Sequence, residues 1–164
     1  MKKVLIIIAI IITLIIVSIV ALFGILFSIF NKEKPSITSD QFISIMSEKN
    51  YAVVNAKSQF IEYDYINKAY IALETNNNFQ IEFYELKDSS YAVQFYNNNV
   101  SKSEESKGVA SSQSNVNLKN SSKFTLSTNG DYMVVSRINN TAIYARVSDK
   151  YKSTVDSLLK ELGY

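Results

Sequence analysis

The chain opens with an uninterrupted apolar run. Residues 4–30 contain no charged side chain, and the only hydroxyl side chains among them are Thr13, Ser18 and Ser28. A helix needs about 20 apolar residues to cross a hydrocarbon core of ~30 Å, so this run is long enough to span it. A cleaved secretory signal is the alternative, but its apolar stretch is shorter and ends in a small-x-small site that this run lacks. The pattern predicts a transmembrane signal anchor over residues 1–30.

Charged residues flank this run almost evenly. Lys2 and Lys3 precede it, and Lys32 and Lys34 come after it. Because the two sides carry equal numbers of lysines, only the positive charge of the amino terminus makes the positive-inside rule favour a cytoplasmic N-terminus. Signal anchors of this layout usually translocate the domain on their C-terminal side, so we expect a single-pass protein of the cell membrane with its C-terminal domain outside. Residues 31–37 form a short polar linker to a domain over residues 38–164.

Beyond the linker, helical and strand periodicities alternate. A capping box at Thr38 and Gln41 begins a helix over residues 39–50. Asp88 and Asp149 cap two later helices whose apolar residues recur every three or four positions. Asn-rich turns separate the segments that alternate as strands do, and Asn129-Gly130 is the strongest hairpin signal among them. The predicted strands are 51–56, 61–66, 69–75, 79–86, 123–128, 131–138 and 141–147.

The order of these elements predicts an α+β fold of antiparallel strands and three helices behind the transmembrane helix. A shift of 62 positions aligns Asn67 with Asn129 and Ile81 with Ile143. This matched spacing favours two βββα repeats, although a chain rich in Asn also generates matching turns by composition. Residues 101–122 between the repeats have little to bury and are predicted to be a mobile loop, whose first few residues could instead extend the preceding helix.

Charge and composition narrow the range of partners. Two of the 17 basic residues precede the apolar run while all 15 acidic residues lie after it, so residues 31–164 carry no net charge. A neutral domain without a basic stripe is a poor nucleic-acid binder, and we expect no nucleic-acid partner. The abundance of Ile, Lys and Asn is typical of a gene of low GC content and suggests a bacterial source.

The residue types exclude most catalytic chemistry. The chain contains no His and no Cys, which removes most general-base, thiol and soft-metal mechanisms. Glu62 and Asp64 would share one face of the strand predicted there and could serve acid–base or calcium chemistry. A solvated strand face explains the same pair without further assumptions. The sequence thus predicts no catalytic residue, no metal and no cofactor, and we do not expect an enzyme.

Tyrosine is the enriched residue type with a functional character. A tyrosine can bury its ring while its hydroxyl stays in contact with water, which suits binding surfaces. A half-buried sheet also favours tyrosine, so the enrichment has a purely structural explanation as well. The candidate binding surface comprises Tyr63, Tyr65, Tyr70, Tyr84, Tyr132 and Tyr144.

These features favour a non-catalytic interaction or sensing module, anchored in the lipid bilayer at the cell surface. Its partner would be another envelope protein or a cell-surface ligand. One alternative is a structural subunit of a membrane complex that uses the anchor helix as its interface. Ala21, Gly24 and Ser28 form a stripe of small residues suited to that role. The other is an envelope enzyme that depends on carboxylates.

Overall fold

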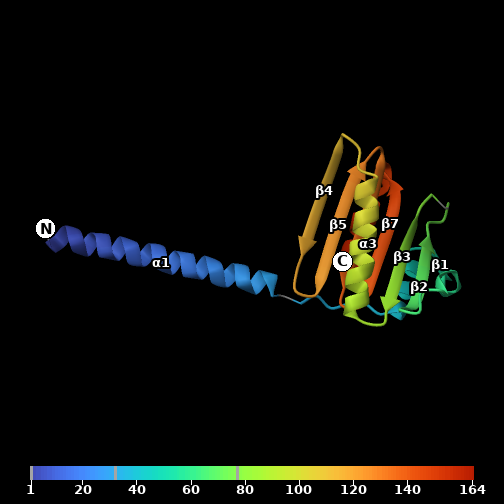
Figure 1. The fold of residues 1–164 in the computed structure, drawn as a ribbon, viewed down its shortest axis with the longest axis horizontal. Helices are drawn as coiled ribbons and strands as arrows, with labels where there is room; N and C mark the ends of the chain where they lie inside the picture. The colour runs from blue at the N-terminus through green and yellow to red at the C-terminus, as the bar shows by residue number, and fades with distance from the viewer. Residues whose placement is uncertain (1, 32, 77) are drawn as a thin grey trace. The chain divides into compact units, whose positions relative to one another are not determined.

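The computed structural model describes residues 2–31, 33–76 and 78–164, and in the first helix it describes the side chains of 12–28. The chain divides into two compact units, Met1–Glu33 and Lys34–Tyr164. Figure 1 shows the α-helices and the antiparallel strands that make up the fold. The predicted α+β class is confirmed, with four α-helices and a seven-stranded antiparallel sheet among the described residues.

The first unit is a single helix, α1 (Lys2–Phe30). Its described side chains, from Ile12 to Ser28, include no charged group and are exposed within this chain. The expected transmembrane anchor also covers the side chains of 1–11, 29 and 30, and the expected linker covers Lys32, all of which lie outside the described set. Among the residues that are described, no helix is found that is both long enough and apolar enough to cross a membrane.

The second unit is built on one sheet in which every neighbouring pair is antiparallel. Its strand order is β1-β2-β3-β7-β6-β5-β4. The strands are β1 (Ala52–Asn55), β2 (Ile66–Leu73), β3 (Gln80–Leu86), β4 (Ser111–Asn117), β5 (Ser121–Thr128), β6 (Asp131–Ile138) and β7 (Thr141–Ser148). The helices are α2 (Ser39–Glu48), α3 (Ser89–Glu105) and α4 (Lys152–Glu161), with 3-10 turns η1 (Lys57–Phe60) and η2 (Asp149–Tyr151).

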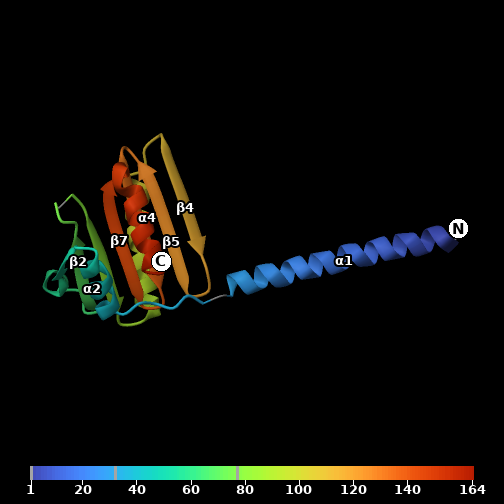
Figure 2. The same cartoon turned by 180° about the vertical axis from the view of Figure 1, so that it is seen from behind.

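The helices cover the sheet on both sides. Helix α3 lies in front of the strands in Figure 1, whereas α2 and α4 lie in front of them when the molecule is turned round in Figure 2. Successive residues of a strand point to opposite faces. Phe83 therefore packs with α2 and α4, while its neighbour Tyr84 packs beneath α3. The second unit is a three-layer structure with a hydrophobic core on each face of the sheet.

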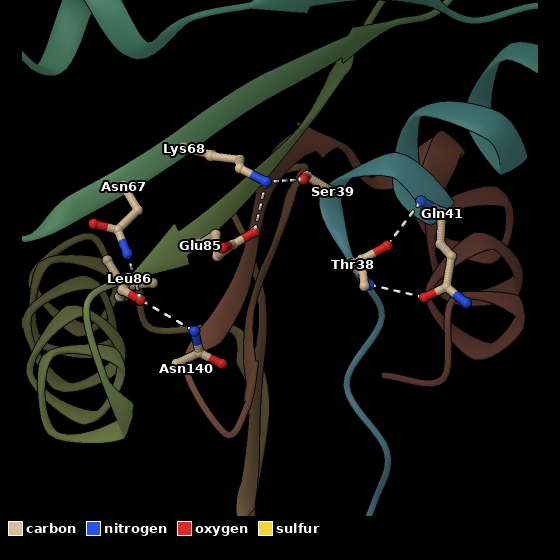
Figure 3. A network of polar contacts seen from close by, with 8 residues as sticks. All are labelled: Thr38, Ser39, Gln41, Asn67, Lys68, Glu85, Leu86 and Asn140. Carbon is tan, nitrogen blue, oxygen red and sulfur yellow. Dashed lines mark hydrogen bonds and ion pairs between the residues drawn. The ribbon is translucent and has the colours of Figure 1, made fainter.

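Polar contacts fix the start of α2 against the sheet (Figure 3). The predicted capping box is present: the Thr38 hydroxyl accepts from the Gln41 amide at 3.2 Å, and the Gln41 side chain accepts from the Thr38 amide at 2.8 Å. The Lys68 ammonium donates to the Ser39 hydroxyl at 2.9 Å and lies 3.5 Å from Glu85. These contacts join α2 to β2 and β3.

Three local predictions are wrong. Asp149 does not cap the last helix, because a 3-10 turn over Asp149–Tyr151 precedes α4 and the N-cap residue of α4 is Tyr151. Residues 61–65 are not a strand, and β2 begins only at Ile66, because the backbone turns there: the Tyr63 amide donates to the Phe60 carbonyl at 3.0 Å and the Ile66 amide to the Tyr63 carbonyl at 3.1 Å.

The segment 101–122, predicted to be a mobile loop, holds all of β4 and the start of β5, while its first residues extend α3 to Glu105 as the alternative had it. Strand β4 buries almost no side chain and is held by its backbone pairing with β5, so hydrophobic patterning could not reveal it.

The predicted βββα repeats are not rigid copies of one another. The first repeat was predicted from strands 61–66, 69–75 and 79–86, and its first strand is absent. With β1 in that place, β1-β2-β3-α3 and β5-β6-β7-α4 share a strand-strand-strand-helix order. Because β3 and β7 are adjacent and antiparallel, the rotation that superimposes one set of strands on the other has its axis perpendicular to the sheet. Such a rotation keeps a helix on its original face, yet α3 and α4 cover opposite faces.

The stability of the core on the α2 face of the sheet should depend strongly on Phe42. This ring is 0 % exposed and stacks on Phe83 with centroids 4.8 Å apart. We expect Phe42→Ala to lower the free energy of unfolding by about 3–5 kcal/mol, measured by urea denaturation of the full chain in micelles. The control Ser47→Ala, at an exposed position of the same helix, should change it by less than about 0.5 kcal/mol. Equal losses in the two variants would contradict this account of the core.

Candidate functional site

A pocket of ≈ 320 Å³ opens on the α3 face of the sheet. Strands β3 and β7 form its floor, α3 forms one wall, and the turn segment before β2 forms the other. We call it the tyrosine pocket. Its lining comprises Phe60, Tyr63, Tyr65, Ile66, Glu82, Tyr84, Phe95, Asn98, Asn99, Lys102 and Tyr144.

Strand pairing sets the floor of the pocket. Glu82 and Tyr84 are two residues apart on β3, so their side chains share the α3 face. Tyr144 of β7 lies directly opposite Glu82 in the β3–β7 register. Three polar side chains from two strands are thereby brought together at one point of the sheet.

Helix α3 supplies the wall from residues spaced along one of its sides. Phe95, Asn99 and Lys102 are separated by intervals of four and three positions, which places them on a common helical face. The Asp88 carboxylate caps the start of the helix by accepting from the amides of Ser90 at 2.8 Å and Tyr91 at 3.1 Å. The Asn99 side-chain amide donates back to the Phe95 carbonyl at 2.8 Å.

The Glu82 carboxylate receives hydrogen bonds from neutral groups. The Tyr84 hydroxyl donates to one of its oxygens at 2.5 Å, and the Gln80 side-chain amide donates to the other at 2.8 Å. Within the described residues no Lys or Arg forms an ion pair with it. The pocket floor therefore carries a half-buried negative charge that is solvated by dipoles and not neutralised by a cation.

The aromatic side chains of the pocket support one another. Tyr84 contacts Phe60 edge-on with centroids 5.4 Å apart and Phe95 at 4.6 Å. Tyr65 contacts Tyr63 edge-on at 5.7 Å and stacks on Tyr91 of α3 at 5.2 Å. Ring pairs at these distances are favourable beyond the area they bury, so contacts within the chain hold the walls of the pocket in place.

Burial and the Glu82 charge keep the tyrosine hydroxyls of the floor protonated. Burial raises the pKa of Tyr84 far above its ordinary value, and the Glu82 charge and hydrogen bond raise it further. Burial, then Glu82, likewise raises the pKa of Tyr144. Both side chains remain neutral hydrogen-bond donors at any physiological pH.

The structure brings together four of the six predicted tyrosines. Tyr63, Tyr65, Tyr84 and Tyr144 line the pocket. Tyr70 and Tyr132 do not, because their positions on β2 and β6 direct them to the opposite face, where they pack with α2 and α4. The prediction of a single surface containing all six is therefore wrong for these two. Tyr132 is 1 % exposed and its hydroxyl donates to Asp156 at 2.5 Å.

Glu82 and the pocket residues of α3 were not among the residues predicted from the sequence. Glu82 lies within a correctly predicted strand and shares the face of Tyr84, so strand alternation contained the signal that would have identified it. Lys102 fell within the segment that was predicted to be a loop. The contribution of Phe60 had no signal in the sequence, because it depends on the turn that replaces the expected strand.

The carboxylate pair considered for acid–base or calcium chemistry does not form a site. Glu62 and Asp64 are exposed in the turn segment. Lys87 lies 2.9 Å from Asp64, and this hydrogen-bonded ion pair lowers the pKa of the Asp64 carboxyl group. Across the described residues no group of three or more acidic side chains is arranged to hold a metal ion.

The raised pKa of Tyr84 predicts how the free energy of unfolding changes at alkaline pH. Its pKa in the folded chain is raised above the ordinary 10.0, so its stabilising contribution is complete below that pH and is lost above it. In Tyr84→Phe, the fall in unfolding free energy above pH 10 should be shallower by up to about 1.4 kcal/mol per pH unit. Urea denaturation between about pH 8 and pH 11 measures this, and parallel curves for the two proteins would contradict it.

Comparison with known proteins assigns no family to the chain. The chain matches no family model, no curated protein and no solved structure.

Proposed function

We propose that this protein is a non-catalytic binding or sensing module, anchored by α1 in the cell membrane, with its second unit outside. The tyrosine pocket would be its recognition site. The observation that carries this proposal is the convergence of four tyrosines on one half-buried carboxylate in a pocket of ≈ 320 Å³. A concave site with aromatic walls and a few oriented polar groups is what small-ligand recognition requires.

The chemistry of the lining supports binding more than catalysis. Glu82 is the only carboxylate among the lining residues, and the chain has no His or Cys to act beside it. Its two oxygens already accept hydrogen bonds from Tyr84 and Gln80, and both donors are neutral. General acid–base catalysis needs a group placed to exchange a proton with substrate, usually beside a second catalytic group. The lining supplies fixed charge, ring faces and amides instead.

The membrane anchor is supported by the sequence of α1. The helix runs without interruption over 29 residues, and no charged residue occurs from Val4 to Phe30. At 1.5 Å per residue, that uncharged stretch is about 40 Å long, more than the ~30 Å of a hydrocarbon core. The outside location of the second unit rests on the usual behaviour of signal anchors.

Photo-crosslinking in cells tests the pocket. Tyr63 is 46 % exposed at the rim, and we expect p-benzoylphenylalanine at this position to capture the bound molecule. The product would be a discrete mass increment on the intact protein. The control places the same group at Val116, 51 % exposed on β4, away from the lining. We expect clearly more adduct at position 63 than at position 116, because a molecule held in the pocket lies beside Tyr63 and away from Val116. Equal labelling at both positions, or none at 63, would contradict the proposal.

Membrane fractionation tests the anchor. We expect the intact chain to stay in the membrane pellet after an alkaline carbonate wash. The double variant Ile16→Arg and Ile19→Arg should be largely released, since each arginine near the centre of a span costs about 2.5–3.5 kcal/mol. A matched Ile16→Leu and Ile19→Leu variant should behave as the parent. Recovery of the intact parent chain in the soluble fraction would overturn the anchor.

A further inference from the structure

We propose that the tyrosine pocket binds a small organic cation, with an ammonium group held between the Glu82 carboxylate and the surrounding aromatic rings. This inference rests on the proposed function, because it names the ligand class of the same pocket.

The uncompensated charge of Glu82 is the first feature that favours a cation. A carboxylate removed from water is costly unless a cation or several donors replace its hydration. Glu82 has two neutral donors, Tyr84 and Gln80, and forms no ion pair with a cation in the described part of the chain. A ligand that carries a positive charge would complete the environment of this carboxylate, whereas an anion would be repelled by it.

The aromatic composition of the walls is the second feature. A cation near the face of a tyrosine or phenylalanine is attracted by the negative face of the ring, and this is how quaternary ammonium ligands are recognised. Phe60, Tyr63, Tyr84, Phe95 and Tyr144 all border the space above Glu82. Aromatic rings and a carboxylate around one space are complementary to a weakly hydrated cation. Neither group alone would select the cation so strongly.

The third feature is the position of Lys102, the one basic residue of the lining. Its side chain is exposed and forms no ion pair or hydrogen bond with the other described residues. A charge in contact with water is screened far more than one among buried rings. The charge of the floor should therefore decide the sign of the ligand, and Lys102 should weaken cation binding slightly.

The volume limits the size of the ligand. A pocket of ≈ 320 Å³ lies at the lower end of the range of about 300–1,000 Å³ for small-molecule sites. It accommodates an ammonium group with a short substituent and leaves little room for a polymer chain. The occupant is therefore a small molecule.

A pair of nearly isosteric probes tests the charge requirement on the unaltered protein. Choline and 3,3-dimethylbutan-1-ol have the same shape, but only choline is charged. Both are titrated into the full chain in micelles whose detergent has no ammonium group, with the methyl proton signals followed by NMR. We expect choline to bind at least tenfold more tightly, a difference of about 1.4 kcal/mol, with its methyl signals moved upfield by the rings.

Three variants locate the interaction. Glu82→Gln keeps the shape and an oxygen for the Tyr84 hydroxyl, and it should weaken choline binding at least tenfold. Glu85→Gln removes the same charge from the same strand on the opposite face, where Glu85 lies beside Lys68, and it should leave binding unchanged. Lys102→Gln should leave binding unchanged or strengthen it.

The inference is overturned if choline fails to bind, if the alcohol binds equally well, or if Glu82→Gln has no effect. Loss of binding in Lys102→Gln would also overturn it, because the ligand would then be held through a negative group. If choline fails while crosslinking at position 63 succeeds, the ligand class is wrong and the proposed function stands. If both fail, the proposed function falls as well.

Discussion

The pairing of β3 with β7 is the contact on which the rest of the second unit depends. These strands come from different parts of the chain, and their backbone hydrogen bonds join the β1-β2-β3 meander to the β7-β6-β5-β4 meander in one sheet. The same register places Glu82 beside Tyr144 and Phe83 beside Ile143. One alignment therefore sets both the floor of the pocket and the centre of the α2–α4 core. A shift by a single residue would exchange the two faces and destroy both.

Many of the helices and strands could be predicted from the sequence, because their capping residues, turn residues and apolar periodicity indicated the same elements. The capping box at Thr38, the hairpin at Asn129-Gly130 and the amphipathic helices were each marked by residues acting over a few positions. The signal failed where structure depends on distant partners. Strand β4 is an edge strand with polar, exposed side chains, and its backbone pairing with β5 is what holds it extended. The turn at 61–65 holds tyrosines that alternate as a strand would, yet Tyr65 stacks on Tyr91 from α3.

The candidate site shows the same division between local and distant information. Strand alternation places Glu82 and Tyr84 on one face, and it also separates Tyr70 and Tyr132 from them once the topology is known. The topology itself, with β7 beside β3 and not at an edge, has no local marker in the sequence. Grouping tyrosines by type alone therefore mixed two faces of the sheet. The two on the α2–α4 face are packing residues, and Tyr132 in addition holds Asp156 of α4 through its hydroxyl.

The location of the pocket is explained by how unequally the two faces of the sheet are covered. Seven strands spaced about 4.8 Å apart give a sheet nearly 30 Å wide, whereas one helix with its side chains covers only about 10–12 Å. Helices α2 and α4 share one face, but α3 is the only α-helix that packs on the other among the described residues. The turn segment covers the β2–β3 side of that face with Phe60 and Tyr65. The tyrosine pocket is the space left between this aromatic cover and α3. The Glu82 carboxylate lies in this gap, where neutral donors from Tyr84 and Gln80 are its hydrogen-bond partners, and this is why we propose that its charge selects the ligand.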